Sequence, residues 1–387
     1  MKIKRNILGI TGIRSEYDIL SSVFRAVQNH PDLNLGVVAT GAHLSPVFGN
    51  TIEAIRADGF PIADEIESLL SGDGLASRVK GLSIQLQGLI QSIQRIRPDM
   101  LLVLGDREEA ISAALAGAYM NIAVAHIAGG DRVIGNVDDQ VRHAVTKLAH
   151  LHFVTNPESY ERVLRLGEQS FRVHLTGNPG LDRFAETPVI MASGLSDCLG
   201  FMIPDSEPFM LVIQHVISTE VEQAYEQMKM TLEAVKQLGI RTILIHPNSD
   251  AGRQQIVQAI REYENLPFLH ISANIPRTVF VNLMRRAGCL LGNSSAGILE
   301  APLIKLPVVN VGNRQKGRLH AENVQFVPHE VEAIKKAVSK ALFDETYRTQ
   351  VRLCVNPYGD GRSSQRIAEI LAAVHLDKNL LIKDITY

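Results

Sequence analysis

Short apolar runs alternate with longer amphipathic stretches along most of this chain. In the first half, the apolar runs predict strands at residues 7–11, 35–40, 100–104, 122–126, 152–155 and 173–176. The stretches between them predict helices at 15–28, 75–96, 108–120, 138–149 and 157–166. Because the runs are continuously apolar, both faces of each strand should be buried, which is typical of a parallel sheet covered by helices.

The pattern weakens between Ala185 and Glu207, a stretch with several Pro and Gly residues, and then resumes. Further strands are predicted at 210–214, 242–245, 268–271, 288–291 and 308–311. We therefore predict an α/β protein with two Rossmann-like, doubly wound domains, 1–185 and 186–362, whose last segment, 363–387, packs back on the first. Two such domains in tandem should place a cleft at the carboxyl ends of their strands.

Composition narrows the possible partners. The chain has 387 residues, which is long enough for two domains, and a net charge of -2, which gives no electrostatic reason to expect nucleic acid or an anionic membrane. No apolar stretch approaches the roughly 18 residues of a transmembrane helix. Its three cysteines, Cys198, Cys289 and Cys354, are far apart. They suit a reducing cytoplasm and predict neither a disulfide framework nor a zinc site.

The most informative stretch is residues 289–302. An apolar run ends in the small polar turn Gly292–Ser295, and a helix is predicted to follow, with Ser295 as its N-cap and Pro302 closing it. Hydroxyls beside unpaired N–H groups would suit a phosphate. Glu300 follows, where a carboxylate could bind the two vicinal hydroxyls of a ribose. The alternative is a capped helix with no ligand.

Polar residues also follow the other predicted strands. In the first half these are Arg14, His43, Asp106, Arg107, Glu108 and Asp131, and in the second half His215, Asn248 and Arg314. The first half thus offers carboxylates for acid–base work, and the second offers groups suited to phosphate and ribose. Simpler interpretations stay open: an Asp106–Arg107 ion pair, a satisfied His126 in a buried strand, Asp138–Asp139 as a helix cap, Arg142–His143 on a solvated face, and 314–318 as an exposed loop.

Seven motifs together make the chain resemble the hydrolysing UDP-N-acetylglucosamine 2-epimerases. They are Thr-Gly-Ile-Arg-Ser-Glu-Tyr (11–17), Gly-Asn-Thr (49–51), Leu-Gly-Asp-Arg (104–107), Asp-Asp-Gln-Val-Arg-His-Ala-Val-Thr-Lys (138–147), Gln-His-Val (214–216), Gly-Asn-Ser-Ser-Ala-Gly (292–297) and Gly-Asn-Arg-Gln-Lys-Gly-Arg (312–318). The resemblance spans residues 7 to about 330. It implies the two-domain GT-B architecture, a homo-oligomer (dimer or tetramer), and elimination of UDP followed by hydration to a free 2-epimerised sugar.

The resemblance also implies roles for single residues. Asp106 matches a carboxylate at the sugar, His215 a histidine near the diphosphate, and Glu300 the ribose-binding glutamate. Ser294 and Ser295 match the phosphate-binding serines, and Arg14 matches the first-loop arginine. Asp131 and Arg314 are weaker matches. His43, Arg107 and Asn248 are implied as further contacts to the UDP-sugar. One position departs from the pattern: some relatives have a catalytic glutamate where this chain has Ala128. Its acid or base role would then fall to Asp106, Glu108 or Asp131.

Two substrates and two other functions stay open. UDP-N-acetylglucosamine is the default substrate of the family, and UDP-2,4-diacetamido-2,4,6-trideoxyglucose is the other. Glu108 and Glu109 stand where family members acting on the former tend to have an aromatic residue, which favours the diacetamido sugar. No metal or cofactor is expected, because the chain has no His-Glu-x-x-His motif and no cysteine ligand set. The alternatives are a GT-B glycosyltransferase and a non-catalytic nucleotide-sugar sensor.

Overall fold

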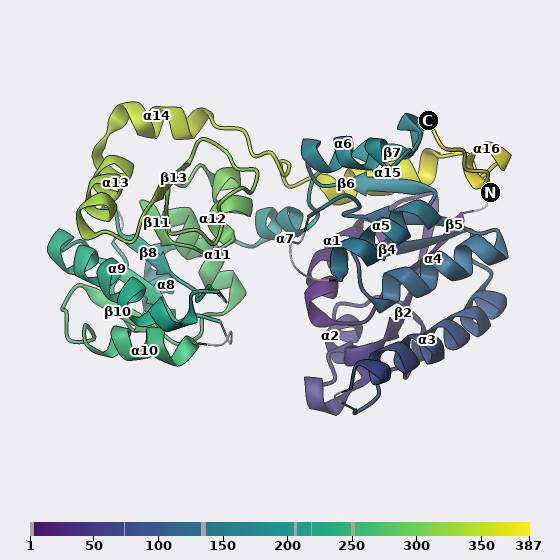
Figure 1. Ribbon diagram of the computed structural model, residues 1–387, viewed down its shortest axis with the longest axis horizontal. Helices are drawn as coiled ribbons and strands as arrows, with labels where there is room; N and C mark the ends of the chain where they lie inside the picture. The colour runs from purple at the N-terminus through teal and green to yellow at the C-terminus, as the bar shows by residue number, and fades with distance from the viewer. Residues whose placement is uncertain (1–3, 73, 133–136, 205–206, 218, 249–251) are drawn as a thin grey trace. The chain divides into compact units, whose positions relative to one another are not determined.

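The chain folds as two compact units, both drawn in Figure 1. The computed structural model describes residues 4–387 apart from 73, 133–136, 205–206, 218 and 249–251. One unit comprises Met1–Ala185 and Tyr358–Tyr387, and the other Glu186–Pro357. Each unit is a parallel sheet with helices on both faces, which confirms the predicted fold class.

The first unit contains a seven-stranded parallel sheet in the order β3-β2-β1-β4-β5-β6-β7. Its strands are β1 (Arg5–Thr11), β2 (Leu33–Thr40), β3 (Ile62–Ile66), β4 (Met100–Leu104), β5 (Ala123–Ile127), β6 (Leu151–Val154) and β7 (Val173–Leu175). Its helices are α1 (Arg14–Asn29), α2 (Ile52–Ala57), α3 (Leu75–Ile96), α4 (Glu108–Met120), α5 (Asp138–Leu148), α6 (Pro157–Arg165), α7 (Gly180–Glu186), α15 (Ser363–Ala373) and α16 (Lys378–Leu381).

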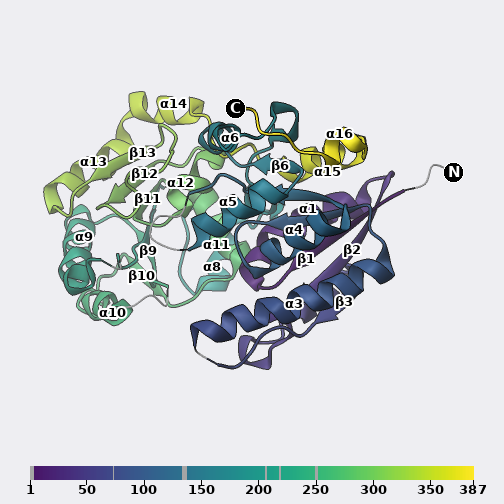
Figure 2. The same cartoon turned by 45° about the vertical axis from the view of Figure 1, so that its right-hand side comes forward.

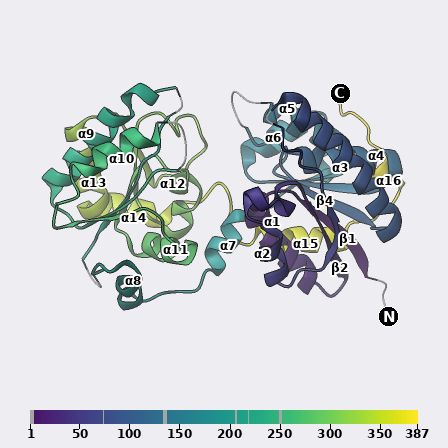
Figure 3. The ribbon, with the colours of Figure 1, turned by 90° about the horizontal axis from the view of Figure 1, so that it is seen from below.

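Alternate side chains of this sheet enter two separate cores. On one face, Ile7 and Leu102 pack with Phe24 of α1 and with Leu371 of α15. Figure 3 shows α1 and α15 side by side. On the other face, residues such as Leu101 pack against α3, α4 and α5. Figure 2 shows these three helices over one face of the sheet. The last segment of the chain therefore completes the first core, since α15 lies against α1.

The second unit contains a six-stranded parallel sheet in the order β10-β9-β8-β11-β12-β13. Its strands are β8 (Met210–Ile213), β9 (Thr242–Ile245), β10 (Leu269–Ser272), β11 (Cys289–Gly292), β12 (Val308–Val311) and β13 (Val324–Val327). Its helices are α8 (Ala192–Leu199), α9 (Ala224–Leu238), α10 (Arg253–Arg261), α11 (Arg277–Arg286), α12 (Ala296–Leu299), α13 (Val331–Phe343) and α14 (Glu345–Leu353). The helices α9, α10, α13 and α14 share one core with the strands.

Both sheets reverse their strand order at one point, and ligands of doubly wound sheets bind beside such a switch point. In the first unit it lies between β1 and β4, so the segments after these strands, Gly12–Glu16 and Gly105–Glu109, flank it. In the second unit it lies between β8 and β11, so Gln214–His215 and Asn293–Ser295 flank it. The topology thus brings the two polar segments of each unit to one edge of its sheet.

The sequence predicted some elements and missed others. The bounds of β4, β9, β12, α3 and α4 coincide with the prediction, whereas β3 and β13 were not predicted. The stretch predicted to be a linker contains helix α8, and residues 205 and 206 of that stretch lie outside the described part. Within the described residues, every helix is either too short or too polar to cross a lipid bilayer.

Candidate functional site

Gly292 lets the end of β11 approach β8 closely. Its φ of +128° lies where L side chains are strained, and a Cβ there would stand 2.1 Å from the carbonyl oxygen of Ile213. The backbone N–H of the next residue, Asn293, donates to that same carbonyl at 3.1 Å. A glycine is therefore required at this position for the polar turn to reach the switch point.

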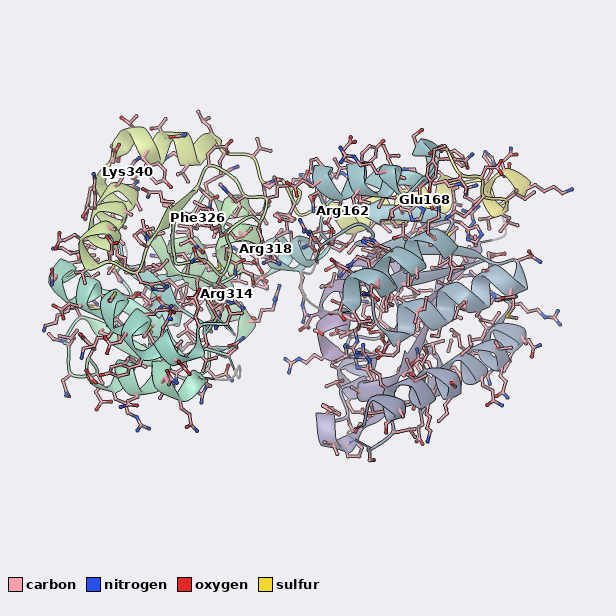
Figure 4. The ribbon with its side chains drawn as sticks, viewed as in Figure 1. Arg162, Glu168, Arg314, Arg318, Phe326 and Lys340 are labelled. Carbon is pink, nitrogen blue, oxygen red and sulfur yellow. The ribbon has the colours of Figure 1, made fainter. Side chains whose placement is uncertain are left out.

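Asn293 is the centre of a hydrogen-bond network in the second unit. Its side chain is buried, its Oδ1 accepts from the backbone N–H of His215 at 2.7 Å, and its Nδ2 donates to the carbonyl of His215 at 2.9 Å. Its own carbonyl accepts from Arg314 Nη1 at 3.1 Å and from Gln315 Nε2 at 2.9 Å. One residue, Asn293, thus joins His215 and Arg314, which Figure 4 labels. Segment 314–318 is a loop in which Lys316 and Arg318 are exposed, whereas Arg314 is partly buried and hydrogen-bonded.

The hydrogen bonds of His215 indicate its tautomer. Its Nδ1 accepts from the backbone N–H of Asn248 at 3.1 Å, so Nδ1 carries no proton. In a neutral imidazole the proton is then on Nε2, which becomes a hydrogen-bond donor. Asn248 therefore acts on His215 through its backbone, which the sequence pattern did not predict.

The predicted N-cap role of Ser295 is wrong. Ser295 has helical φ and ψ of −61° and −21°, and its side chain makes no capping bond. The backbone N–H of Ala296 instead donates to Ser294 Oγ at 3.3 Å, so the capping hydroxyl belongs to the residue before. The helix is also shorter than predicted, because α12 ends at Leu299 and a 3₁₀ turn, Ala301–Ile304, follows with Pro302 inside it.

Glu300 carries a buried oxygen without a partner. Oε2 is inaccessible to solvent and has no hydrogen-bond partner among the described residues. Burial raises the pKa of Glu300, and the charge of Arg277 opposes that rise. A buried carboxylate oxygen left unpaired is costly, so a ligand hydroxyl that donates to it would be bound favourably.

In the first unit, Asp106 pairs with Arg142. Both side chains are largely buried, at 16% and 8% exposure, and Arg142 also donates to the carbonyl of Ala128 at 2.9 Å. Burial lowers the pKa of Arg142 to about 10. The partner of Asp106 therefore comes from α5, which excludes both the simple Asp106–Arg107 pair and a solvated Arg142.

Two buried carboxyl groups, which sequence reasoning did not select, flank Gly12 at the switch point. Glu16 Oε2 accepts from the backbone N–H of Gly12 at 3.0 Å, and Glu109 packs so closely that a Cβ on Gly12 would stand 1.6 Å from its Oε1. Burial and mutual repulsion raise the pKa of Glu16, and burial raises that of Glu109. Two such neighbours disfavour the state in which both are ionised. The sequence held one signal for this pair, because Glu16 stands two residues after Arg14 and Glu109 stands two residues after Arg107.

Arg107 and Glu108 belong to the same cluster. Arg107 lies 3.5 Å from Glu109 Oε2 and 3.6 Å from Glu108 Oε2. Burial would raise the pKa of Glu108, but the hydrogen bond from Arg78 of α3 and the charges of both arginines outweigh it and lower that pKa. Glu108 is thus held ionised while Glu16 and Glu109 favour their protonated forms.

The remaining predicted residues lie in different surroundings. Asp131 Oδ1 accepts from Thr155 at 2.6 Å and from Ser159 at 2.7 Å, so it is tied to the end of β6 and the start of α6. His43 lies 3.1 Å from Thr11 Oγ1 and 2.7 Å from Thr51 Oγ1, and burial lowers its pKa to about 4. The Arg14 side chain is 77% exposed.

His126 is a satisfied histidine of a buried strand. Its Nε2 donates to the carbonyl of Gly105 at 2.7 Å, and burial lowers its pKa to about 3. No group of three or more His, Cys, Asp or Glu residues suited to a metal ion occurs in the part of the chain that the structure describes.

Comparison with known proteins identifies the family. The family model described as UDP-N-acetylglucosamine 2-epimerase matches residues 25–372. The chain is 34% identical to a UDP-N,N'-diacetylbacillosamine 2-epimerase (hydrolyzing) of Legionella pneumophila over 98% of both chains. It is 32% identical to a GDP/UDP-N,N'-diacetylbacillosamine 2-epimerase (hydrolyzing) of Campylobacter jejuni over 87% of both.

A solved structure shares the fold at lower identity. The UDP-GlcNAc 2-epimerase of Neisseria meningitidis bound to UDP-GlcNAc superposes with a TM-score of 0.77 at 21% identity, covering 95% of this chain and 99% of that one. This likeness agrees with the two parallel, doubly wound sheets described above. The chain belongs to the UDP-N-acetylglucosamine 2-epimerase family, as its motifs indicated.

Proposed function

We propose that this protein is a hydrolysing UDP-sugar 2-epimerase whose second unit holds UDP and whose first unit acts on the sugar. Family membership supports the reaction. The observation that carries the proposed nucleotide site is the buried, unpartnered oxygen of Glu300, one turn beyond the Gly292–Ser295 turn. A carboxylate in that position accepts the hydroxyl hydrogens of a ribose while the turn faces its phosphates.

The groups around Asn293 suit a leaving diphosphate. Breaking the C1–O bond of the sugar leaves its electron pair, and hence negative charge, on UDP. His215 offers an Nε2–H donor, Ser294 and Ser295 offer hydroxyls, and Arg314 offers a cation. Because Asn293 fixes the backbone of His215 and one nitrogen of Arg314 in advance, little reorganisation accompanies the change in charge.

The sugar chemistry needs a base and an acid. A carboxylate removes the C2 proton, the C1–O bond breaks, and a C1–C2 double bond forms with release of UDP. Water then adds its oxygen to C1, and a proton reaches C2 on the opposite face, which gives the free manno-configured sugar. We assign this proton transfer to Asp106, whose carboxylate Arg142 orients, with Glu108 and Asp131 as the remaining candidates. The pair Glu16 and Glu109 joins that set because both carboxyl groups are buried beside Gly12 at the same switch point and their pKa values are raised.

We propose UDP-2,4-diacetamido-2,4,6-trideoxyglucose as the preferred substrate. This sugar nucleotide is also called UDP-N,N'-diacetylbacillosamine. The names of the Legionella and Campylobacter relatives contain that compound. Glu108 supports it, because an ionised side chain paired with Arg78 stands where family members acting on UDP-N-acetylglucosamine tend to have an aromatic ring. Turnover of both substrates, measured side by side, is expected to favour the diacetamido sugar.

A comparison of UDP with 2'-deoxy-UDP tests the ribose contact. The wild-type protein should bind 2'-deoxy-UDP about tenfold more weakly, since a hydrogen bond to a charged group contributes roughly 1.5–3 kcal/mol. Glu300→Ala should bind both nucleotides equally, whereas the control Glu332→Ala, at a side chain that is 82% exposed in the same unit, should keep the wild-type ratio. An unchanged preference for UDP in Glu300→Ala would place the ribose elsewhere.

Incubation with the UDP-sugar alone separates the alternatives. The epimerase releases UDP and free sugar without an acceptor, a glycosyltransferase releases little, and a sensor releases none. We further propose a cytoplasmic location, supported by three free thiols at Cys198, Cys289 and Cys354. A homo-oligomer remains a prediction of the family resemblance, which sedimentation of the purified chain tests.

A further inference from the structure

Lys383 caps the carboxyl end of α5 from the far end of the chain. Its Nζ donates to the carbonyls of Thr146 at 3.2 Å, of Lys147 at 2.9 Å and of Ala149, and its side chain is 16% exposed. The last carbonyls of a helix have no partner within the helix and carry partial negative charge. A buried ammonium placed among them satisfies these groups and stabilises the last turn of α5.

The segment that carries Lys383 is firmly anchored to the first unit. Arg172, which is fully buried, donates to the carbonyls of Asn379 at 2.7 Å, of Leu380 and of Ile382 at 2.7 Å. The side chain of Leu380 lies in the core beside α1 and α15. The peptide segment that leads to Lys383 is therefore held both by hydrogen bonds from Arg172 and by the core packing of Leu380.

Glu168 supplies the countercharge for Lys383. It is almost fully buried, lies 2.7 Å from Lys383 Nζ, and also pairs with Lys147 at 2.7 Å and with His152 at 3.0 Å. Figure 4 labels Glu168 in the first unit. A buried lysine is tolerated when a carboxylate and hydrogen-bond acceptors surround it, and this one has both.

The helix that Lys383 caps holds the proposed catalytic segment by two routes. One turn before the cap, Arg142 pairs with Asp106 and binds the carbonyl of Ala128. Thr146, whose carbonyl accepts from Lys383, has its hydroxyl 3.3 Å from Nδ1 of His126. The other nitrogen of His126 donates to the carbonyl of Gly105, the residue just before Asp106.

We propose that Lys383 is a positioning residue for Asp106: by capping α5 it fixes Arg142 and Thr146, and through them the carboxylate and the backbone beside it. The inference rests on the proposed role of Asp106 in proton transfer. Catalytic geometry is steep, since a displacement of about 1 Å can cost a factor of about 100 in rate. Loosening the last turn of α5 therefore lowers turnover without weakening the binding of UDP.

Lys383→Met tests the proposal, because it keeps the length of the side chain and removes its charge. We expect kcat to fall about tenfold with KM and the Kd for UDP unchanged. The amides of residues 142–149 should exchange hydrogen for deuterium faster. Lys378→Met, an exposed lysine in the same segment, is the matched control and should leave both readouts at wild-type values.

Two further variants distinguish positioning from general stability. Lys383→Arg keeps the charge with a different geometry, so it should recover part of kcat. If Lys383→Met does not fold, Lys383→Arg provides the folded variant for the same measurements. Combining Lys383→Met with Arg142→Lys should lose less turnover than the product of the two single losses, since Lys383 acts in part through Arg142. An unchanged kcat in the folded Lys383 variants, or losses that multiply, would overturn the proposal. Because amide exchange needs no turnover, it reports on the cap even if Asp106 proves not to be catalytic.

Discussion

The two units share one architecture but differ in the chemistry at their switch points. In the second unit, a neutral amide, Asn293, and an imidazole in a fixed tautomer, His215, arrange donors around one turn. In the first, carboxyl groups stand close together with pKa values moved in opposite directions, up for Glu16 and Glu109 and down for Glu108. A preformed set of donors suits the binding of an anion, whereas carboxyl groups with divergent pKa values suit proton transfer.

The largest expected effect separates chemistry from binding. Asp106→Asn keeps the shape of the side chain and removes its charge, so turnover should fall about 100-fold or more, which is the scale of general acid–base catalysis. The Kd for UDP should be unchanged, because the groups proposed to bind the uridine diphosphate at the Asn293 turn lie in the other unit. Single-turnover kinetics with calorimetry of UDP binding measure both. Near-normal turnover would make Asp106 structural and move the proton chemistry to Glu108, Asp131 or the Glu16–Glu109 pair.

Removing the hydroxyls of the polar turn should weaken the binding of UDP. Ser294→Ala combined with Ser295→Ala removes two hydroxyls from the turn, and the Kd for UDP should rise about tenfold or more. Folding should change little, because among the described residues the two hydroxyls are seen in one bond, from the backbone N–H of Ala296 to Ser294. Ser272→Ala, at the end of β10, is the control in the same unit. Unaltered UDP affinity in the double variant would show that the phosphates do not lie at this turn.

Acid should weaken the first unit before the second. Burial lowers the pKa of His126 to about 3 and of His43, His150 and His152 to about 4, all in the first unit. The unfolded chain binds protons at these histidines near pH 6.5 while the folded unit does not, so stability is lost as pH falls from about 6.5 toward 4. Amide exchange at pH 7, 5.5 and 4.5 follows each unit separately. Earlier loss of protection in the second unit would contradict this comparison.

The smallest effect concerns the carboxyl pair. Because the pKa values of Glu16 and Glu109 are raised, the folded unit keeps protons that the unfolded chain has lost. The contribution of this pair to stability therefore falls as pH rises above about 4.5, opposite in sign to the contribution of the histidines. Glu109→Gln resembles the protonated form and removes this penalty. It should raise Tm by about 2 °C or more at pH 8. At pH 5 the gain should be smaller, and an equal gain at both pH values would mean that the pKa of Glu109 is not raised.

The sequence predicted the buried strands better than the edge strands. The run Met100–Leu104 is buried on both faces and was recognised by its continuous apolar side chains. Strands β3 and β13 lie at sheet edges and are partly exposed, so Ile62–Ile66 and Val324–Val327 contain polar residues that conceal them. The other two edge strands, β7 and β10, were predicted, so an edge position makes a strand harder to recognise but does not always conceal it.

The candidate site residues were chosen by residue type and by position, and their contacts were not predicted. Asp106 and His215 follow strands, where ligands of doubly wound sheets bind, and Glu300 follows the short helix after the polar turn. The pairing of Glu16 with Glu109 depends on β1 lying beside β4, although 93 residues of sequence separate the two side chains. The role of Asn293 depends in the same way on β8 lying beside β11. Strand order is a tertiary property that periodicity along one chain does not contain.

Isotope labelling tests the proposed reaction most directly. The protein is incubated with the UDP-diacetamido sugar in deuterium oxide, and the free sugar is examined by proton NMR and mass spectrometry. Elimination followed by hydration predicts a manno-configured product with one deuterium at C2, because the original proton leaves with the base and its replacement comes from solvent. A product that keeps protium at C2, or that retains the gluco configuration, would contradict the epimerase mechanism, whichever carboxylate transfers the proton.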